Sequence, residues 1–188
     1  MLRVHSSHHP LGEELTEISK IYYQKANSFS IALGGCYKFI IMTTESEMIT
    51  LHIILADDDI DDRQFFEKAL KEIPIPNHFT TVNDGEQLMN YLHMNSDHLP
   101  DILFLDLSMP RKTGFECLSE IKEDEKLKDL PVIMLSTSFT RDNKYEQHII
   151  NVLYTIGAMD YIRKPGYYQT LKEDIHKTLI KVTLKDVG

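Results

Sequence analysis

Four groups of chemically active side chains stand where short apolar runs of the sequence end. They are three consecutive carboxylates, a single carboxylate, two hydroxyls and one ammonium, namely Asp57–Asp59, Asp106, Ser136 with Thr137, and Lys164. Carboxylates that are brought close together repel one another and raise each other's pKa values. A divalent cation with oxygen ligands relieves this repulsion, and Mg²⁺ suits a site with few carboxylates and several waters.

These side-chain types also fit the transfer of a phosphoryl group. A carboxylate held beside Mg²⁺ can attack phosphorus and form an aspartyl phosphate. The cation, a lysine and a hydroxyl can then neutralise the phosphoryl oxygens, and the reaction needs little beyond such positioning. Asp106 interrupts an apolar run, where a charge costs on the order of several kcal/mol unless it is neutralised.

Apolar runs alternate with amphipathic segments from Leu51 onward. Five runs predict buried strands, at Leu51–Ala56, His78–Val82, Ile102–Leu107, Val132–Leu135 and Tyr161–Ile162. Helical spacing of apolar residues predicts five helices, at Ile60–Ile73, around Leu88–Leu92, and at Thr113–Glu123, Asp142–Ile156 and Tyr167–Val182. Continuous apolar strands separated by amphipathic helices imply an α/β fold, a doubly wound five-stranded parallel sheet covered by helices on both faces.

Two of these helices have an apolar face that includes an aromatic residue. The first is expected to bury Phe65, Phe66, Ala69, Leu70 and Ile73, and the third to bury Phe115, Leu118 and Ile121.

Each polar residue taken alone has an ordinary structural explanation. An acid after a strand is often a helix cap, Ser136 and Thr137 can satisfy backbone groups, and most lysines are solvated. Ligands of open α/β sheets, however, bind beyond the carboxyl ends of the strands. Because four strand ends carry these groups together, we favour a binding site at this edge.

The sequence resembles the receiver domain of two-component response regulators over residues 48–188. The resemblance is carried by ILADDD (54–59), FLDLSMP (104–110) with Gly114, PVIMLSTS (131–138) and GAMDYIRKP (157–165). It implies the flavodoxin-like (βα)5 fold of that family. It also implies a signalling switch rather than an enzyme, one that supports its own phosphotransfer and slow autodephosphorylation.

The resemblance assigns a phospho-acceptor and a metal site. Asp106 corresponds to the phospho-acceptor, and Asp57 and Asp58 correspond to the acid pair that holds Mg²⁺. In the family pattern Asp58 holds the ion directly and Asp57 holds it through water, while Ser108 lends its backbone carbonyl. Asp59 fits the start of a helix better than a metal ligand.

The resemblance also assigns a switch. Lys164 corresponds to the ion-pair partner of the phosphoryl group, and Ser136 to the hydroxyl that bonds it. Tyr161 corresponds to the aromatic residue that moves inward with that hydroxyl, although an ordinary core aromatic explains it equally well. The segment 139–154 is longer than is usual, so partner contacts cannot be carried over there.

NDGEQLMNYL (83–92) and DLSMPRKTGFECLSEIK (106–122) are similar to small response regulators paired with phytochrome-like histidine kinases. The chain stops soon after its last predicted helix, so we expect a stand-alone regulator that acts by contact. Expected partners are a sensor histidine kinase or a histidine phosphotransfer protein and an output protein of unknown identity. Homodimer formation stays open.

Composition separates the first 47 residues from the rest. The chain has 188 residues and a formal net charge of −9, yet every Asp lies after position 47. We expect residues 1–47 to be a poorly structured extension or the product of a mis-assigned start, and 48–188 to be the receiver domain.

The whole composition favours a cytoplasmic protein. Net acidity argues against direct DNA binding, and no apolar run is long enough for membrane insertion. Cys36 and Cys117 form no CxxC pair, which argues against a disulfide scaffold and fits a reducing compartment.

Two other functions remain open. One is a Mg²⁺-dependent phosphohydrolase with an aspartyl nucleophile, although such enzymes carry an acid two residues after it, where this chain has Ser108. The other is a degenerate receiver that serves only for docking, against which the intact acid, hydroxyl and lysine set argues.

Overall fold

The computed structural model describes residues 50–137, 143–164 and 166–185. The predicted extension at 1–47 lies outside these residues. The strands are β1 (Leu51–Ala56), β2 (Asn77–Val82), β3 (Ile102–Asp106), β4 (Val132–Ser136) and β5 (Asp160–Arg163). The helices are α2 (Ile60–Glu72), α3 (Gly85–Met94), α4 (Gly114–Glu123), α5 (Asn143–Ile156) and α6 (Tyr168–Lys185). All ten predicted elements are therefore present, with ends that differ by a few residues.

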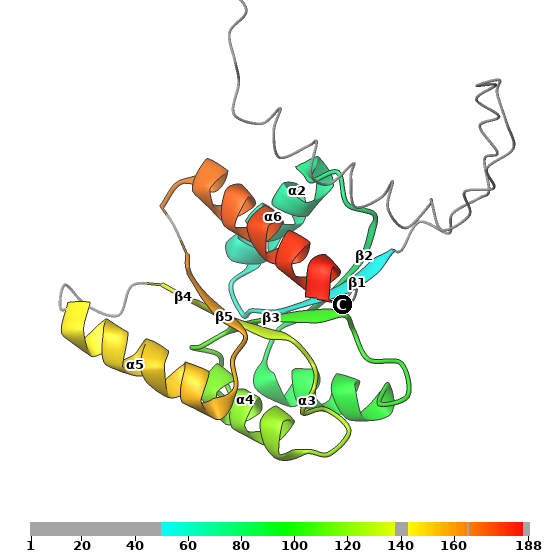
Figure 1. Cartoon of the computed structure of the whole chain (residues 1–188), viewed down its shortest axis with the longest axis vertical. Helices are drawn as coiled ribbons and strands as arrows, with labels where there is room; N and C mark the ends of the chain where they lie inside the picture. The colour runs from blue at the N-terminus through cyan, green and yellow to red at the C-terminus, as the bar shows by residue number, and fades with distance from the viewer. Residues whose placement is uncertain (1–49, 138–142, 165, 186–188) are drawn as a thin grey trace, which may run out of the picture. The chain divides into compact units, whose positions relative to one another are not determined.

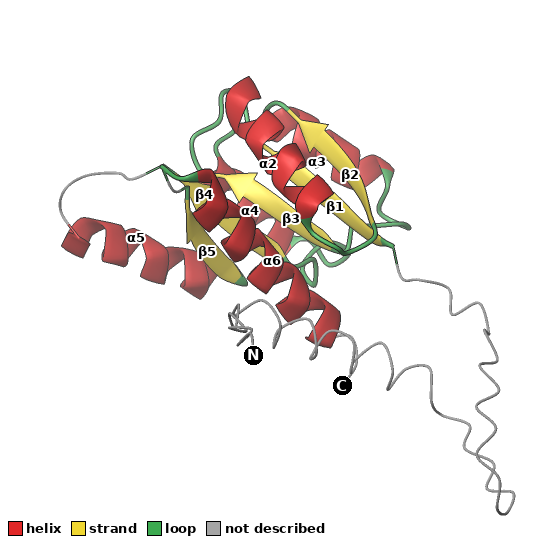
Figure 2. Ribbon diagram, turned by 90° about the horizontal axis from the view of Figure 1, so that it is seen from above, coloured by secondary structure: helices red, strands yellow, loops and turns green. Residues whose placement is uncertain are grey.

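The five strands form one parallel sheet in the order β2-β1-β3-β4-β5. Figures 1 and 2 show this sheet between two layers of helices. One layer, α2 and α6, packs on a core that contains Ile53, Leu55 and Phe104. The other layer, α3, α4 and α5, packs on a core that contains Ile54 and Leu105. The predicted doubly wound, flavodoxin-like sheet is confirmed.

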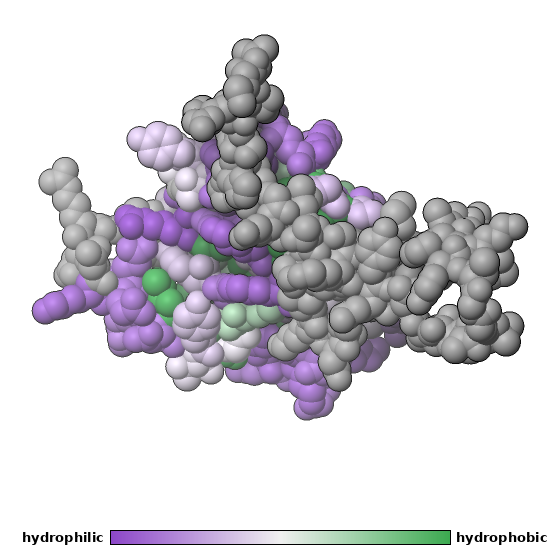
Figure 3. All heavy atoms as spheres, turned by 45° about the horizontal axis from the view of Figure 1, so that its top comes forward, coloured by the Kyte–Doolittle hydropathy of each residue, from purple (hydrophilic) through white to green (hydrophobic). Residues whose placement is uncertain are grey.

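Side chains alternate between these two cores along each central strand, which is why both faces of β1 and β3 are apolar. The visible face of the described residues is mostly hydrophilic, with small apolar areas between charged side chains (Figure 3). Among the residues that the structure describes, no helix has the length and apolar character needed to span a membrane.

Two expected core aromatics are instead half-exposed. Phe65 is 51% exposed and Phe115 is 40% exposed. On α2 the buried positions are Phe66, Ala69 and Leu70, and this stripe leaves Phe65 at its edge. On α4 the buried Cys117 takes the place next to Leu118 that the prediction gave to Phe115.

Polar caps fix where the helices begin beside the sheet edge. The Asp59 carboxylate accepts hydrogen bonds from the backbone N–H groups of Asp61 and Asp62, which confirms Asp59 as a helix-start residue. Thr113 and Glu116 form a capping box at the start of α4. The first turns of α2 and α4 are therefore anchored directly behind the ends of β1 and β3.

Gly114 allows α4 to approach β3 closely. A Cβ atom at this position would lie 2.1 Å from the backbone oxygen of Asp106, whereas a Cβ at Gly166 would meet nothing within 4 Å. The Gly114 N–H also donates to the Leu107 carbonyl over 3.1 Å. Only a residue without a side chain keeps this contact.

We expect Gly114→Ala to lower the free energy of unfolding by about 2 kcal/mol or more, because the added methyl group must displace backbone. Urea denaturation measures the change, with Gly166→Ala as the matched control that stays within about 0.5 kcal/mol of the unaltered protein. Equal stabilities of the two variants would contradict the close packing of α4 on β3.

Candidate functional site

The candidate site lies at the carboxyl edge of the sheet, where three neighbouring strands deliver polar residues. Asp57 directly follows β1, Asp106 ends β3 and Ser136 ends β4. The Asp57 N–H donates to the Val82 carbonyl over 3.1 Å, and the Lys164 N–H donates to the Ser136 carbonyl over 2.8 Å. Sheet-type hydrogen bonding therefore continues past the strand ends and holds these residues side by side.

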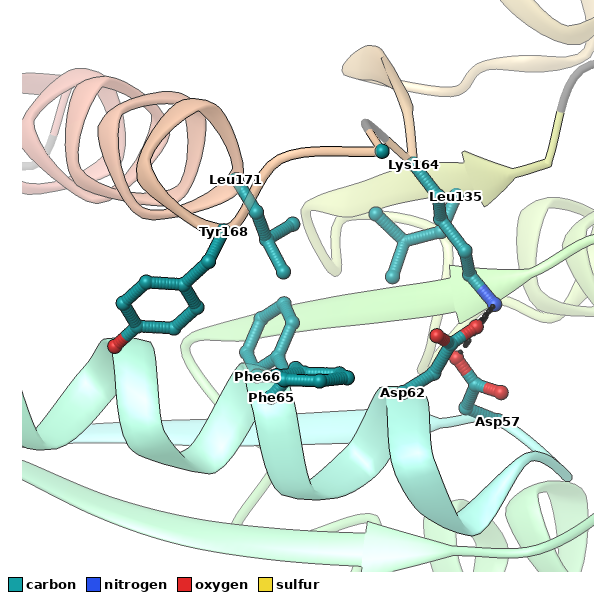
Figure 4. A pocket seen from close by; sticks show the side chains of 9 residues that line it. Asp57, Asp62, Phe65, Phe66, Leu135, Lys164, Tyr168 and Leu171 are labelled. Carbon is teal, nitrogen blue, oxygen red and sulfur yellow. Dashed lines mark hydrogen bonds and ion pairs between the residues drawn. The ribbon is translucent and has the colours of Figure 1, made fainter.

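Lys164 occupies the centre of the site. Its Nζ lies 2.6 Å from Asp106 Oδ1, 2.8 Å from Asp57 Oδ2 and 2.8 Å from Asp62 Oδ2. Figure 4 shows Asp57 and Asp62 converging on the ammonium from β1 and α2. Because an ammonium group has three N–H donors, the three carboxylates use all of them. We call Lys164 with these three acids the Lys164 cluster.

Burial differs within the Lys164 cluster. The side chains of Asp57 and Asp106 are 2% and 7% exposed, and that of Lys164 is 13% exposed. The Asp62 side chain is 36% exposed and lies on the solvent side. The three more buried members, Asp57, Asp106 and Lys164, therefore bring together two carboxylates and one ammonium.

The pKa values reflect this crowding. The pKa of Asp57 is raised to about 6, mainly by burial and in part by the negative charge of Asp106, while the hydrogen bond and charge of Lys164 limit the rise. Burial alone would lower the pKa of Lys164, but hydrogen bonds to Asp106, Asp57 and Asp62 outweigh it and raise that pKa. The ammonium is held in its charged form, and the carboxylates carry the unrelieved charge.

The remaining carboxylate oxygens are held by backbone amides. The Ser108 N–H donates to Asp106 Oδ2 over 2.7 Å, and the Asp59 N–H donates to Asp57 Oδ1 over 3.1 Å. Each acid therefore has one oxygen fixed by the loop that follows its strand and another directed at Lys164. Asp106 is thereby fixed in orientation at the end of the central strand.

The four predicted metal-holding residues lie around this edge of the sheet. Asp57 and Asp106 share Lys164, the Asp58 side chain is exposed, and Ser108, predicted to act through its backbone carbonyl, directly follows Leu107. Within 50–137, 143–164 and 166–185, no group of three His, Cys, Asp or Glu side chains is arranged to hold a metal ion. The Lys164 ammonium supplies the positive charge between the acids in this arrangement.

The predicted switch residues form a second network beside β4. Ser136 is buried, and its Oγ donates to the Thr137 carbonyl over 2.7 Å. The Tyr161 hydroxyl donates to Glu146 Oε1 on α5 over 3.2 Å. Burial and the Glu146 charge raise the pKa of Tyr161, and the neighbouring Ser136 hydroxyl opposes that rise. The Tyr161 hydroxyl thus joins β5 to α5 beside the buried Ser136.

Two members of these networks were not expected from the sequence. Asp62 is the third helical residue after the Asp59 cap, and side chains at that position point back toward the helix start. This position in the first helical turn was the feature of the sequence from which the contact of Asp62 with the site could have been predicted. Glu146 carries no comparable signal, because its partner Tyr161 lies 15 residues away in a separate strand.

A cavity of about 290 Å³ adjoins the Lys164 cluster (Figure 4). Its walls are apolar side chains of α2, β4 and α6, among them Phe65, Phe66, Leu135, Tyr168 and Leu171. The half-exposed position of Phe65 thus belongs to the wall of this cavity. The charged cluster is consequently bordered by an apolar surface on its α2–α6 side.

Comparison with known proteins agrees with this geometry. Residues 53–176 match the family described as "Response regulator receiver domain". The response regulator Rcp1 of Synechocystis sp. is 33% identical over 104 residues, which cover 52% of this chain and 71% of that protein.

Two solved structures share the fold and are similar in sequence. The phosphorylated cyanobacterial phytochrome response regulator RcpA has a TM-score of 0.58 and 32% identity, and the match covers 69% of this chain and 91% of that one. The Mn²⁺-bound form of Rcp1 has a TM-score of 0.58 and 26% identity, with 68% and 90% covered. The family match, which spans more than half of the chain, and these likenesses show that the chain belongs to the response regulator receiver domain family.

Proposed function

We propose that this protein is a response regulator that accepts a phosphoryl group on Asp106 in the presence of Mg²⁺ and thereby changes its binding to an output protein. The observation that carries this proposal is the placement of Asp106. It ends the central strand, its side chain is 7% exposed, and Lys164 Nζ lies 2.6 Å from its Oδ1. A lysine so placed can neutralise phosphoryl oxygens as they arrive.

The proposed transfer exchanges one bond to phosphorus for another and involves no oxidation or reduction. An oxygen of the Asp106 carboxylate attacks phosphorus and forms a new P–O bond. The bond from phosphorus to the donor breaks and the donor keeps that electron pair, as a neutral imidazole from a phosphohistidine whose other ring nitrogen carries a proton, or as acetate from acetyl phosphate. The Ser108 N–H, 2.7 Å from Asp106 Oδ2, holds the carboxylate in one orientation during this attack.

The donor set fits a divalent cation. Asp57 and Asp106 are two buried carboxylates that share one ammonium, that of Lys164. We expect Asp58, Asp57 and Asp106, with the backbone carbonyl of Ser108, to hold Mg²⁺, which prefers such oxygen ligands. The relative Rcp1 has a Mn²⁺-bound form, which supports a divalent ion here. The bound ion would supply charge neutralisation at the phosphoryl oxygens.

The donor and the output are proposed from the same chemistry. We expect the phosphoryl group to come from phosphohistidine, on a cytoplasmic sensor histidine kinase of the phytochrome-like class or on a phosphotransfer protein; the similarity to a phytochrome response regulator supports this class. For the output, Ser136 would turn from the Thr137 carbonyl to the phosphoryl group, and Tyr161 would follow it. That movement would change the contact of Tyr161 with Glu146 on α5, and hence the surface that a partner reads.

We expect acetyl phosphate with Mg²⁺ to add the mass of one phosphoryl group to the protein, and Asp106→Asn to abolish the addition because an amide is a poor nucleophile. Intact-mass spectrometry measures the product. Asp97→Asn is the matched control, since Asp97 is an exposed acid outside the site, and it should label normally. Labelling that survives in Asp106→Asn, or steady hydrolysis of phosphate esters, would reject the proposal.

We expect Lys164→Met to lower the free energy of unfolding by about 3 kcal/mol in EDTA, because it leaves buried carboxylates without their cation. Mg²⁺ should restore part of this loss and should stabilise the variant more than the unaltered protein. Urea denaturation with and without Mg²⁺ measures both effects. Lys177→Met is the control, because Lys177 is exposed and 3.9 Å from Asp174. Identical responses of the two variants to Mg²⁺ would refute the metal site.

A further inference from the structure

Asp62 is the member of the Lys164 cluster that the proposed phosphoryl transfer does not use. Its Oδ2 lies 2.8 Å from Lys164 Nζ, the same distance as Asp57 Oδ2. It reaches the ammonium from α2, while Asp57 and Asp106 come from the sheet (Figure 4). Its side chain is 36% exposed, against 2% for Asp57.

The main chain that carries Asp62 is held firmly against the sheet. Arg63 Nη1 donates to the Asp57 carbonyl over 2.6 Å. One turn further along α2, the Phe66 ring packs edge-on against Phe104, with ring centroids 4.8 Å apart. Phe104 lies two residues before Asp106 on β3. The first turn of α2 therefore keeps a fixed position relative to the phospho-acceptor strand, and the Asp62 side chain is the part that can turn.

The number of hydrogen-bond donors makes Asp62 a competitor. Before the transfer, while Asp106 still carries its charge, the three N–H groups of Lys164 are matched by three carboxylates, so an incoming phosphoryl oxygen can be bonded only if one contact is released. Asp57 is buried, and its loss of Lys164 would leave a charge without solvent. Asp62 can release the ammonium at the smallest cost, because its exposed carboxylate is hydrated as it leaves.

We propose that Asp62 is a positioning residue that holds Lys164 back from the incoming phosphoryl group and so restrains the phosphorylation of Asp106. The inference rests on the proposed function. Asp62 acts through Lys164 and does not touch the reacting atoms. Its removal frees one N–H of Lys164 for the phosphoryl oxygens and speeds the transfer.

The test follows the rate of phosphorylation by acetyl phosphate and Mg²⁺, as intact mass against time over a range of donor concentrations. We expect Asp62→Asn to raise the maximal rate about three- to fivefold, the value of one partly exposed ion pair. Asp62→Glu keeps the charge and should return the rate toward that of the unaltered protein. Urea denaturation of each variant verifies that it is folded.

Asp61→Asn is the matched control. It removes the same charge from the neighbouring position of the same helical turn, where the side chain is exposed. We expect it to change the maximal rate less than about twofold, which is within the effect of one screened surface charge. Equal acceleration by both variants, or an effect only on the donor concentration at half-maximal rate, would mean simple repulsion of the donor and would overturn the inference.

A double-mutant cycle tests the route through Lys164. We expect Lys164→Met to slow phosphorylation, and adding Asp62→Asn to it should leave that rate unchanged, because the residue through which Asp62 acts is gone. An equal acceleration in that background overturns the inference, as does a slower rate in Asp62→Asn alone. Failure of the proposed function has a different signature, which is labelling that persists in Asp106→Asn.

Discussion

One ammonium group among three carboxylates sets the main physical constraint on this protein. Burying like charges together is unfavourable, and the Lys164 cluster is stable only because Nζ lies within 2.8 Å of each acid. That geometry requires β1, β3 and the segment after β5 to end at one edge, and α2 to begin there. The two buried acids, Asp57 and Asp106, also carry one negative charge more than Lys164 can balance, which is the kind of arrangement found at functional sites.

The sheet order explains why this edge can be built. β3 is central, with β1 on one side and β4 on the other, so Asp106 stands between Asp57 and Ser136. Both faces of β3 are buried against separate helical layers, which gives this strand little freedom to move. Gly114 then lets α4 close over the backbone of Asp106. Asp106 is therefore closely packed on both faces of its strand and along its backbone.

The sheet and the convergence of Asp57, Asp106 and Lys164 could be predicted because both follow from patterns that are local in sequence. Apolar runs identify the strands, and parallel strands bring their carboxyl ends to one edge. To predict that Asp62 contacts Lys164, one needs the exact phase of α2 relative to the sheet. To predict that Phe65 is half-exposed, one needs to know which side of α2 the sheet covers. The contact of Tyr161 with Glu146 depends on how α5 lies against β5, which no local pattern specifies.

Ser136 is the residue that joins the charged edge to this second contact. Its carbonyl accepts the Lys164 N–H over 2.8 Å, while its hydroxyl lies beside Tyr161, whose own hydroxyl bonds Glu146. The Ser136 backbone thus contacts Lys164, while its side chain lies next to the Tyr161–Glu146 contact. Because Ser136 is 2% exposed, its hydroxyl needs a protein partner, and that partner is the Thr137 carbonyl in this arrangement. In the proposed function, a phosphoryl group on Asp106 would offer this hydroxyl a second partner, and the change would reach α5 without any movement of the sheet.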